Sequence, residues 1–249
     1  ERGWIRAIEH LHEGVIGEVY MARGLCFKPR GSIGTSPDSM PPEWLDWNLW
    51  QGPAEERPYN SLYVHYNWHW FWLYGNGDLG NQGAHQMDVA IWGMNKGLPV
   101  RVSSTGGRFG YKDQGETPNT QICTFTYRDG TVLSFEVRGL ATNSEQGVKI
   151  GNLFYGSEGY MVEQKFYDKK GKEIRLGGTR RARAREKNDD DPFTSFLKAV
   201  RSRNSADLRA PAFDGHIASA HCHLGNIAFR VGHDLQFDPE TERFVGDFS

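Results

Sequence analysis

The hydrophobic positions at the start of the chain follow first a helical and then a strand period. Trp4, Ile8 and Leu11 are spaced along one face of a helix, and Gly14 stands where a helix C-cap belongs. The segment 17–27 alternates and is rich in strand-forming residues, which predicts a strand. Because the chain begins inside the predicted helix, we expect the sequence to be part of a longer protein.

The middle of the chain predicts one helix followed by a series of strands. Apolar side chains recur at helical spacing over 81–95, and the sequence Gly-Leu-Pro at 97–99 ends the pattern. Asp129-Gly130 lies between two alternating segments and is typical of a hairpin turn, and a second turn is predicted at 155–160. Strands are predicted at 100–104, 120–127, 131–138, 148–155 and 159–166.

This order of elements indicates an α+β fold, a large and mainly antiparallel open β-sheet with helices packed on one face. We expect residues 1–249 to form one domain. The charged segment 180–187 precedes three aspartates and predicts a solvated loop. Asp191-Pro192 then predicts the start of a helix, and a last helix is predicted over 214–231. We expect the first of these helices to have a buried face formed by Phe193, Phe196, Leu197 and Val200.

A long proline-rich segment separates the first strand from the central helix. It runs from about residue 28 to residue 60 and contains one possible helical turn at 44–50. Loops of this length in compact domains are usually functional or cover a pocket. All eight tryptophans lie between Trp4 and Trp92, so the first third of the chain is expected to build an aromatic structure.

Composition excludes some classes of partner. The 249 residues have a net charge of −2, whereas a nucleic-acid-binding surface usually needs a strongly basic face. No apolar segment approaches the roughly 18 residues needed to cross a bilayer. Neither nucleic acid nor a membrane is therefore an expected partner. The three cysteines are far apart and are interpreted as small buried side chains: Cys26, Cys123 and Cys222.

The segment Gly75 to Gly80 matches the pattern G-x-G-x-x-G of dinucleotide-binding loops. We interpret the match as coincidental. The preceding segment mixes tryptophan and histidine instead of forming a Val/Ile strand, and the chain has no acidic residue about 20 positions later to hold a ribose.

The helix after this loop carries a candidate acid/base pair. Asn81, His85 and Asp88 share one face if the helix is continuous. Imidazole is suited to exchange a hydroxyl proton near neutral pH, and a carboxylate one turn away can orient it. The alternative is a buried structural histidine bonded to Asp88.

An aromatic segment just upstream is a candidate sugar-binding surface. Flat aromatic faces pack against sugar rings, while His and Asn side chains bond the hydroxyls. The alternative is a well-filled core or a subunit interface. The candidate substrate-binding residues of this segment are His65, Asn67, Trp68, His69 and Trp70.

A metal site is a third possibility, but no spacing matches a known metal signature. His221 and His223 lie two apart in a predicted helix and cannot point the same way. The other candidate ligands are His65, His69, His85 and Asp88.

Three segments together resemble the C-terminal domain of Gfo/Idh/MocA oxidoreductases: AIEHLHEGVIGEVYMARG, HYNWHWFWLYGNGDLGNQGAHQMDVAIW and HCHLGNIAFRVGHDLQFDPETERFVGD. The resemblance implies an antiparallel substrate-binding domain that follows an N-terminal Rossmann domain. It implies NAD(P) for the full-length enzyme, with no cofactor bound by this chain alone. It also implies a carbohydrate or cyclitol substrate and self-association through the open sheet face.

The resemblance also assigns residues. The catalytic histidine falls on His85, the acid after it on Asp88, and Asn81 stands where many members have aspartate. The glycine-rich loop, with Asp78, is then expected to face the substrate, and Arg30 of the proline-rich segment to reach a substrate carboxylate or hydroxyl.

Two other functional classes remain open at this point. A chain that is complete without a Rossmann domain would be a cofactor-independent lyase, hydrolase or epimerase, with metal assistance from His69, His85 and Asp88, or a plain sugar-binding protein. It could also pair through its sheet with a separate nucleotide-binding subunit.

Overall fold

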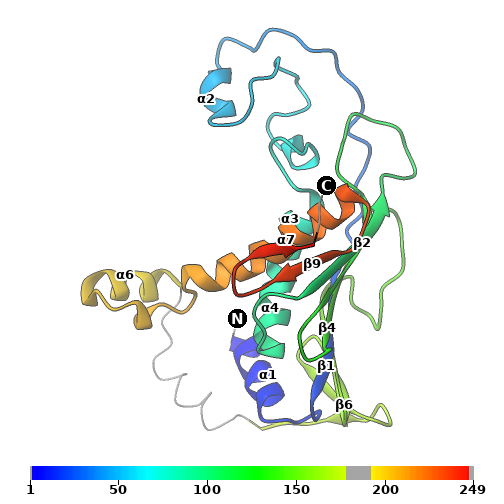
Figure 1. The fold of residues 1–249 in the computed structure, drawn as a ribbon, viewed down its shortest axis with the longest axis vertical. Coiled ribbons are helices and arrows are strands. Elements are labelled where there is room, and N and C mark those ends of the chain that lie inside the picture. The colour runs from blue at the N-terminus through cyan, green and yellow to red at the C-terminus, as the bar shows by residue number, and fades with distance from the viewer. Residues whose placement is uncertain (1, 178–191, 247–249) are drawn as a thin grey trace.

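A ten-stranded sheet forms the body of the molecule, which is described here from a computed structural model (Figure 1). The structure describes residues 2–177 and 192–246. The strand order is β10-β9-β2-β3-β4-β1-β5-β6-β7-β8, and every neighbouring pair is antiparallel except β1 and β4. The predicted α+β class with a mainly antiparallel open sheet is confirmed. The strands are β1 (Val19–Cys26), β2 (Arg101–Gly107), β3 (Thr120–Thr126), β4 (Val132–Arg138), β5 (Ile150–Gly156), β6 (Gly159–Val162), β7 (Lys165–Asp168), β8 (Glu173–Ile174), β9 (Leu235–Asp238) and β10 (Arg243–Val245).

Helices cover one face of this sheet, as predicted (Figure 1). The α-helices are α1 (Arg2–His12), α2 (Trp47–Gln51), α3 (Gly77–Asn81), α4 (Gly83–Met94), α6 (Pro192–Ser202) and α7 (Ala212–Val231), and the 3₁₀ helices are η1 (Asn67–Trp70) and η2 (Ser205–Asp207). Among these described elements, α1, α3, α4 and α7 form the layer against the strands.

The main core lies between that layer and the sheet. Alternate residues of the strands face the helices, such as Ala22 and Cys26 of β1 and Phe135 of β4, and all are at most 1% exposed. Close approach of α4 requires Gly93, because a Cβ there would lie 2.4 Å from the ring of Phe154. The position of α4 on the sheet is therefore tightly fixed.

The hairpin predicted at Asp129-Gly130 is present between β3 and β4. Gly130 has φ of 85°, and the Asp129 carboxylate accepts hydrogen bonds from the backbone and side chain of Thr131. The turn predicted at 155–160 joins β5 and β6. The predicted strand 159–166 is instead two strands, β6 and β7, because the chain turns back where Glu163 adopts φ of 55°.

The helix predicted over 81–95 is broken. A short helix, α3, ends at Asn81, and α4 begins at Gly83, with Gln82 between them. Asn81 and His85 therefore do not lie on one continuous helix, so spacing alone does not place them on the same face.

The prediction for α6 was wrong in one respect. The helix forms, but its apolar side chains are exposed instead of buried, and α6 projects away from the rest of the chain (Figure 1). Helical periodicity shows that a face is apolar; it does not show that a partner lies within reach. The cap residue Asp191 and the segment 180–187 lie outside the described residues.

The proline-rich and aromatic segments together form a lobe above the upper end of the sheet, from about residue 31 to residue 76 (Figure 1). Its interior is a cluster of stacked and edge-packed rings that includes Trp47, Trp50, Tyr63 and Tyr74. The predicted helical turn is α2, whose N-cap Asp46 accepts a hydrogen bond from the Leu49 amide at 2.9 Å.

None of the helices within residues 2–177 and 192–246 combines the length and the apolar character that a bilayer span requires. Within the same ranges, all three cysteines are buried with free thiols, as the sequence predicted.

Candidate functional site

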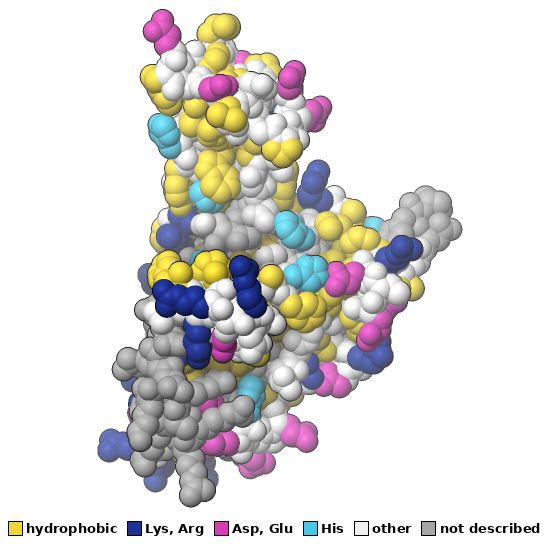
Figure 2. All heavy atoms as spheres, turned by 90° about the vertical axis from the view of Figure 1, so that its left-hand side faces the viewer, with side chains coloured by type: hydrophobic (Ala, Val, Ile, Leu, Met, Phe, Trp, Pro, Cys, Tyr) yellow, Lys and Arg dark blue, Asp and Glu magenta, His cyan; other side chains and the backbone are white. Residues whose placement is uncertain are grey.

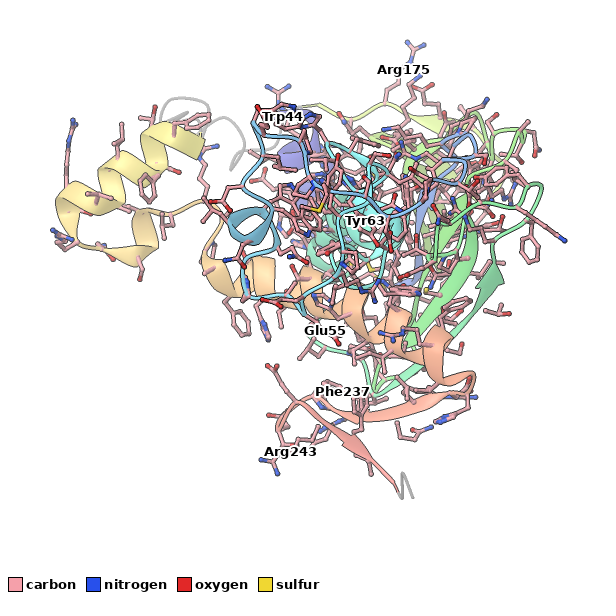
Figure 3. The ribbon with its side chains drawn as sticks, turned by 90° about the horizontal axis from the view of Figure 1, so that it is seen from above. Trp44, Glu55, Tyr63, Arg175, Phe237 and Arg243 are labelled. Atoms are coloured by element: carbon pink, nitrogen blue, oxygen red, sulfur yellow. The ribbon has the colours of Figure 1, made fainter. Side chains whose placement is uncertain are left out.

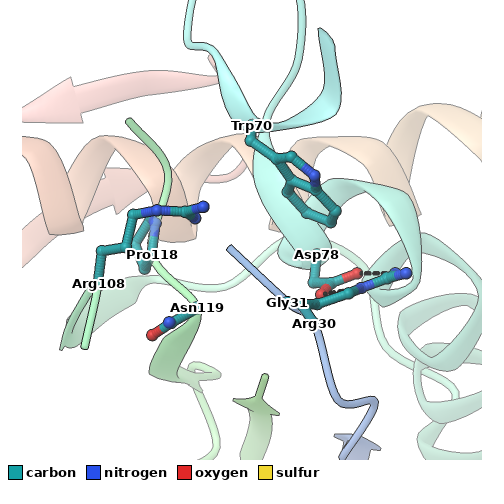
Figure 4. Close-up of a pocket in the computed structure, with 7 residues that line it drawn as sticks. All are labelled: Arg30, Gly31, Trp70, Asp78, Arg108, Pro118 and Asn119. Atoms are coloured by element: carbon teal, nitrogen blue, oxygen red, sulfur yellow. Dashed lines mark hydrogen bonds and ion pairs between the residues drawn. The ribbon is translucent and has the colours of Figure 1, made fainter. Parts of the chain in front are cut away.

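Several predicted site residues meet where the lobe joins the upper end of the sheet (Figure 4). Arg30 follows β1, Asp78 belongs to α3, and Trp70 ends η1. Arg108 comes directly after β2, and Asn119 directly precedes β3. Antiparallel pairing brings the end of β2 and the start of β3 together. The sheet thus gathers residues from distant parts of the chain around one small pocket.

Arg30 and Asp78 form a bidentate ion pair in this pocket (Figure 4). Nε and Nη2 of Arg30 donate to the two carboxylate oxygens at 3.0 and 2.6 Å, and Asp78 is only 2% exposed. The hydrogen bonds to Asp78 raise the pKa of Arg30, against the opposing effect of burial. The guanidinium also lies 5.0 Å from the centre of the Trp70 ring and donates to the Tyr66 hydroxyl at 3.1 Å.

A second bidentate pair lies on the opposite wall. Arg108 donates to both carboxylate oxygens of Asp113 at 2.6 and 2.7 Å and to the Thr117 carbonyl at 3.1 Å. Burial opposes ionisation of Asp113, yet the hydrogen bonds from Arg108 lower its pKa overall. Both arginines of the pocket are therefore paired with carboxylates already.

This pocket is small for a sugar. Its enclosed cavity volume is about 10 Å³, far below the roughly 300–1,000 Å³ of typical ligand sites. The Asn119 amide is also engaged, since it bonds the backbone N–H and C=O of Phe109 at 3.0 and 2.8 Å. The charged and amide side chains of the pocket are thus already paired within the protein.

The predicted acid/base residues lie on the outer side of the helix layer. Met87, Ala90 and Ile91 of α4 face the core, whereas His85 and Asp88 are both exposed. The interpretation of His85 as a buried structural histidine is therefore wrong. Within the described part of the chain, no hydrogen bond joins His85 to Asp88.

The surroundings of Asp88 change its acidity. Asp88 retains solvent contact, but neighbouring protein atoms crowd the carboxyl group and raise its pKa. The nearby charge of Asp214, in the first turn of α7, raises it further, and His85 acts in the opposite direction. Asp88, His85 and Asp214 are thus close enough to interact electrostatically.

Asn81 points back toward the pocket. Its Nδ2 donates to Asp78 Oδ1 at 3.4 Å, the same oxygen that accepts from Arg30. The chain turns at Gln82, and the Gln82 side chain donates to Gln86 at 3.0 Å. Asp78 therefore links the pocket to the turn that leads into the helix carrying His85.

The other aromatic-segment candidates do not form one open platform. His65 stacks on Trp44 at 5.5 Å, far up the lobe, and Trp68 stacks on His69 at 3.7 Å. His69 also bonds the Tyr66 carbonyl through Nδ1, Asn67 begins η1, and Trp70 is 5% exposed. Of these five residues, Trp70 alone lines the pocket of Figure 4.

The glycine-rich loop has a geometry unlike that of a dinucleotide fingerprint. It follows the 3₁₀ helix η1 instead of a strand, and it opens a helix of only five residues. Gly75 packs against the backbone of His69, where a Cβ would lie 2.6 Å from the Cα. Gly75 thus allows close packing within the lobe.

The metal-ligand candidates are likewise separated. No group of three or more His, Cys, Asp or Glu residues in the ranges 2–177 and 192–246 could hold a metal ion. His221 is fully buried and His223 is exposed, so they point in different directions as predicted.

Three polar residues near the candidate sites were not identified from the sequence: Arg108, Asp113 and Asp214. Neither Arg108 nor Asp113 belongs to a sequence motif. They form an ion pair because the segment between β2 and β3 folds back on itself. Asp214 reaches Asp88 only because α7 packs against α4. The sequence contains no local signal for either arrangement.

Comparison with known proteins gives a family match over most of the chain. Residues 24–249 match the pattern of a family described as "Oxidoreductase family, C-terminal alpha/beta domain". A search of the curated proteins found no match.

Solved structures share the fold at low sequence identity. The WlbA dehydrogenase from Chromobacterium violaceum, in complex with NADH and UDP-GlcNAcA, is 14% identical at a TM-score of 0.60; the match covers 96% of this chain and 60% of that one. The WlbA dehydrogenase from Bordetella pertussis, with the same ligands, is 14% identical at 0.58, covering 93% and 58%. An oxidoreductase from Thermotoga maritima is 15% identical at 0.55, covering 94% and 58%. This chain thus spans about 60% of the length of these proteins.

Proposed function

Because the chain belongs to the Gfo/Idh/MocA oxidoreductase family, as its C-terminal α/β domain, we propose that it is the substrate-binding and catalytic domain of an NAD(P)-dependent sugar or polyol oxidoreductase. The observation that carries this proposal is the exposure of His85 on α4, at the position of the family's catalytic histidine. An exposed imidazole with an adjacent carboxylate is available to a substrate, whereas a buried one would not be.

His85 exchanges the hydroxyl proton in the proposed reaction. During oxidation of an alcohol, an imidazole nitrogen takes the O–H proton while the carbon loses hydride, which leaves a carbonyl group. In the reverse direction the imidazolium returns that proton. Asp88 lies close enough to His85 to interact with it electrostatically, and we assign it the role of orienting the imidazole.

The nicotinamide that accepts or donates the hydride would be held outside this chain. The described residues do not fit a dinucleotide, because the glycine-rich loop joins a 3₁₀ helix to a five-residue helix. We therefore assign cofactor binding to a nucleotide-binding domain, in line with the NADH complexes of the longer WlbA proteins.

In this proposal the half-buried Trp68 and His69 at the base of the lobe provide the aromatic contacts to a carbohydrate, because Trp70 is 5% exposed. Trp70 lines the pocket, Asn67, Trp68 and His69 belong to the same 3₁₀ helix η1, and His65 precedes that helix. We propose that a sugar or cyclitol ring lies across this base, with its reacting hydroxyl toward His85. Both WlbA complexes contain a nucleotide sugar, which agrees with this substrate class.

In this proposal Arg30, Asp78 and Asn81 form the floor of the substrate region. Arg30 and Asp78 neutralise each other's charge. The ion pair therefore gives the substrate region a fixed surface and hydrogen-bonding groups, but no unpaired charge. Asn81, held by Asp78, sets the turn before α4 and leaves its amide oxygen to accept a bond from a substrate hydroxyl.

We also propose self-association through the sheet face opposite the helices. That face carries Ile122, which is 44% exposed, among polar side chains, and Arg23 there pairs with Glu136 at 2.8 Å and Glu145 at 2.5 Å. No specific observation favours the cofactor-independent alternatives.

Substitution of the proposed acid/base tests the function. In the native-length protein, His85→Ala should lower NAD(P)-linked oxidation of its best sugar or cyclitol substrate by about 10²–10⁴-fold, the usual contribution of a general acid or base. The matched control is His223→Ala, which removes another exposed histidine from a helix in the same layer. Equal rates for His85→Ala and the wild type would refute the role of His85.

A further inference from the structure

Helix α6 presents an apolar face that nothing in the described structure covers. Its exposed side chains lie at i, i+3, i+4 and i+7, the spacing of a helix that docks into a groove. The exposed fractions are 83% for Phe193, 58% for Phe196, 52% for Leu197 and 44% for Val200. We call these four residues the α6 stripe.

The body of the molecule does not supply the partner. The principal contact of α6 is the neighbouring 3₁₀ helix η2, where the Ser202 hydroxyl donates to Asp207 at 2.6 Å. Viewed from above, α6 stands apart from the sheet and the other helices (Figure 3). Figure 2, turned so that α6 faces the viewer, shows hydrophobic side chains along its upper side and basic side chains below them.

An uncovered stripe of this kind is costly in water. Helices of about 12 residues or fewer are marginal in isolation, and most of their stability in proteins comes from packing of the apolar face. Two phenylalanines at more than half exposure lose the favourable burial that aromatic rings normally contribute. The sequence of α6 is therefore that of a docked helix.

The surroundings of the stripe indicate which side the partner occupies. The outer side of the helix layer also carries His85, Asp88 and Trp92, which is 39% exposed. Helix α1 packs there too, since His12 bonds the Trp92 carbonyl at 3.0 Å. The N-terminal end of the chain and α6 lie on this same side of the sheet (Figure 1).

We propose that the α6 stripe docks onto a nucleotide-binding domain of the native-length protein. This inference rests on the proposed function, because the reaction at His85 requires a nicotinamide to be brought to the outer side of α4. Docking of α6 holds that domain on the side of the helix layer that carries His85.

The size of the stripe favours this occupant over a second copy of the chain. A stable dimer buries about 800 Å² per partner, and four partly exposed side chains provide only a fraction of that. A domain in the same polypeptide needs far less area, since a covalent link gives it a high effective concentration. The family match is to a C-terminal domain and the solved relatives extend well beyond the shared part, which leaves room for such a domain.

Hydrogen exchange on the native-length protein tests the docking. The amides of residues 192–202 should be protected in the wild type, and Leu197→Asp should speed their exchange by about tenfold or more. Phe193→Ala, a milder change at the most exposed position, should speed it by less. The matched control is Leu49→Asp, the same substitution at a residue of α2 that is 77% exposed on the lobe; it should leave the exchange of α6 unchanged.

Two further measurements separate docking from the proposed reaction. NADH affinity should be retained in Leu197→Asp, because the nucleotide site lies in the other domain, while the hydride-transfer rate falls. Protection of the α6 amides does not depend on which substrate is oxidised. The docking proposal can therefore be confirmed or refuted independently of the assignment as a sugar oxidoreductase. Three results would each overturn the proposal: a native protein that begins near Glu1, rapid exchange of α6 in the wild type, or protection that rises with protein concentration in parallel with dimer mass.

Discussion

Two carboxylates ten residues apart, Asp78 and Asp88, illustrate different uses of the same side chain. Asp78 is 2% exposed, and both of its oxygens accept bonds from Arg30. Asp88 is exposed on α4, with a second carboxylate and a histidine near it but no bidentate partner among the described residues. A carboxylate whose two oxygens are both bonded to an arginine holds the chain in place. An exposed carboxylate without such a partner is available to a ligand.

The largest effect on stability should come from breaking the ion pair between Arg30 and Asp78. Asp78→Asn leaves the largely buried Arg30 guanidinium without its counter-charge, which we expect to lower the free energy of unfolding by about 3 kcal/mol. Urea denaturation measures this change. The same substitution at the exposed site, Asp88→Asn, should alter stability by less than about 0.5 kcal/mol. If the two variants are equally stable, the contrast between the two aspartates does not hold.

The histidines allow the same comparison between a buried and an exposed group. His221 is fully buried, its Nδ1 donates to the Ile217 carbonyl at 2.8 Å, and its Nε2 accepts from the Tyr127 hydroxyl at 3.0 Å. Burial lowers the pKa of His221 to about 4. The unfolded chain binds this proton near pH 6.5, so stability should fall by about 2–3 kcal/mol as the pH drops from 6.5 to 4.

Urea midpoints at pH 7 and pH 4.5 measure that loss. His221→Gln should be less stable at pH 7 because the Tyr127 contact is disturbed, but it should lose less stability on acidification than the wild type. The exposed His223, replaced in the same way, should leave the acid response unchanged. An identical response in all three proteins would mean that other groups control acid unfolding.

The smallest change should be at Asp88 itself, and it should affect rate rather than stability. Asp88→Asn removes the carboxylate charge that interacts with His85, so turnover should fall by about tenfold, with the KM for sugar little changed. Because the pKa of the Asp88 carboxyl is raised, the wild type loses this charge as the pH falls, and the difference between the two enzymes should shrink at the low end of the pH profile. Unchanged turnover and an unchanged pH profile would remove Asp88 from the mechanism.

Local patterns were reliable where short-range physics decides the structure. The Asp129-Gly130 turn, the alternation of the central strands and the spacing of α1 all rest on residues close in sequence. Predictions became less accurate where a single residue redirects the chain, as at Gln82 between α3 and α4 or Glu163 between β6 and β7. Neither position has a glycine or proline to indicate the break.

The candidate site shows the same division. The resemblance of motif predicts His85 as the catalytic histidine, which stays a prediction, and the fold leaves this residue exposed on α4. By contrast, Arg30 and Asp78 are chemically suitable ligands for a substrate, and only the structure shows that they are bonded to each other across 48 residues of sequence. No sequence motif predicted the ion pair between Arg108 and Asp113.

The sequence by itself determined the fold class, the family and the type of residue at the candidate site. These follow from periodicity, turn chemistry and motifs, which are properties of neighbouring residues. Only the tertiary structure decided which charges are neutralised, which aromatic rings are buried in the lobe, and that the stripe of Phe193 to Val200 is uncovered. The physical reason is that burial and charge pairing depend on residues brought together from far along the chain, and an amphipathic pattern specifies a face without specifying its partner.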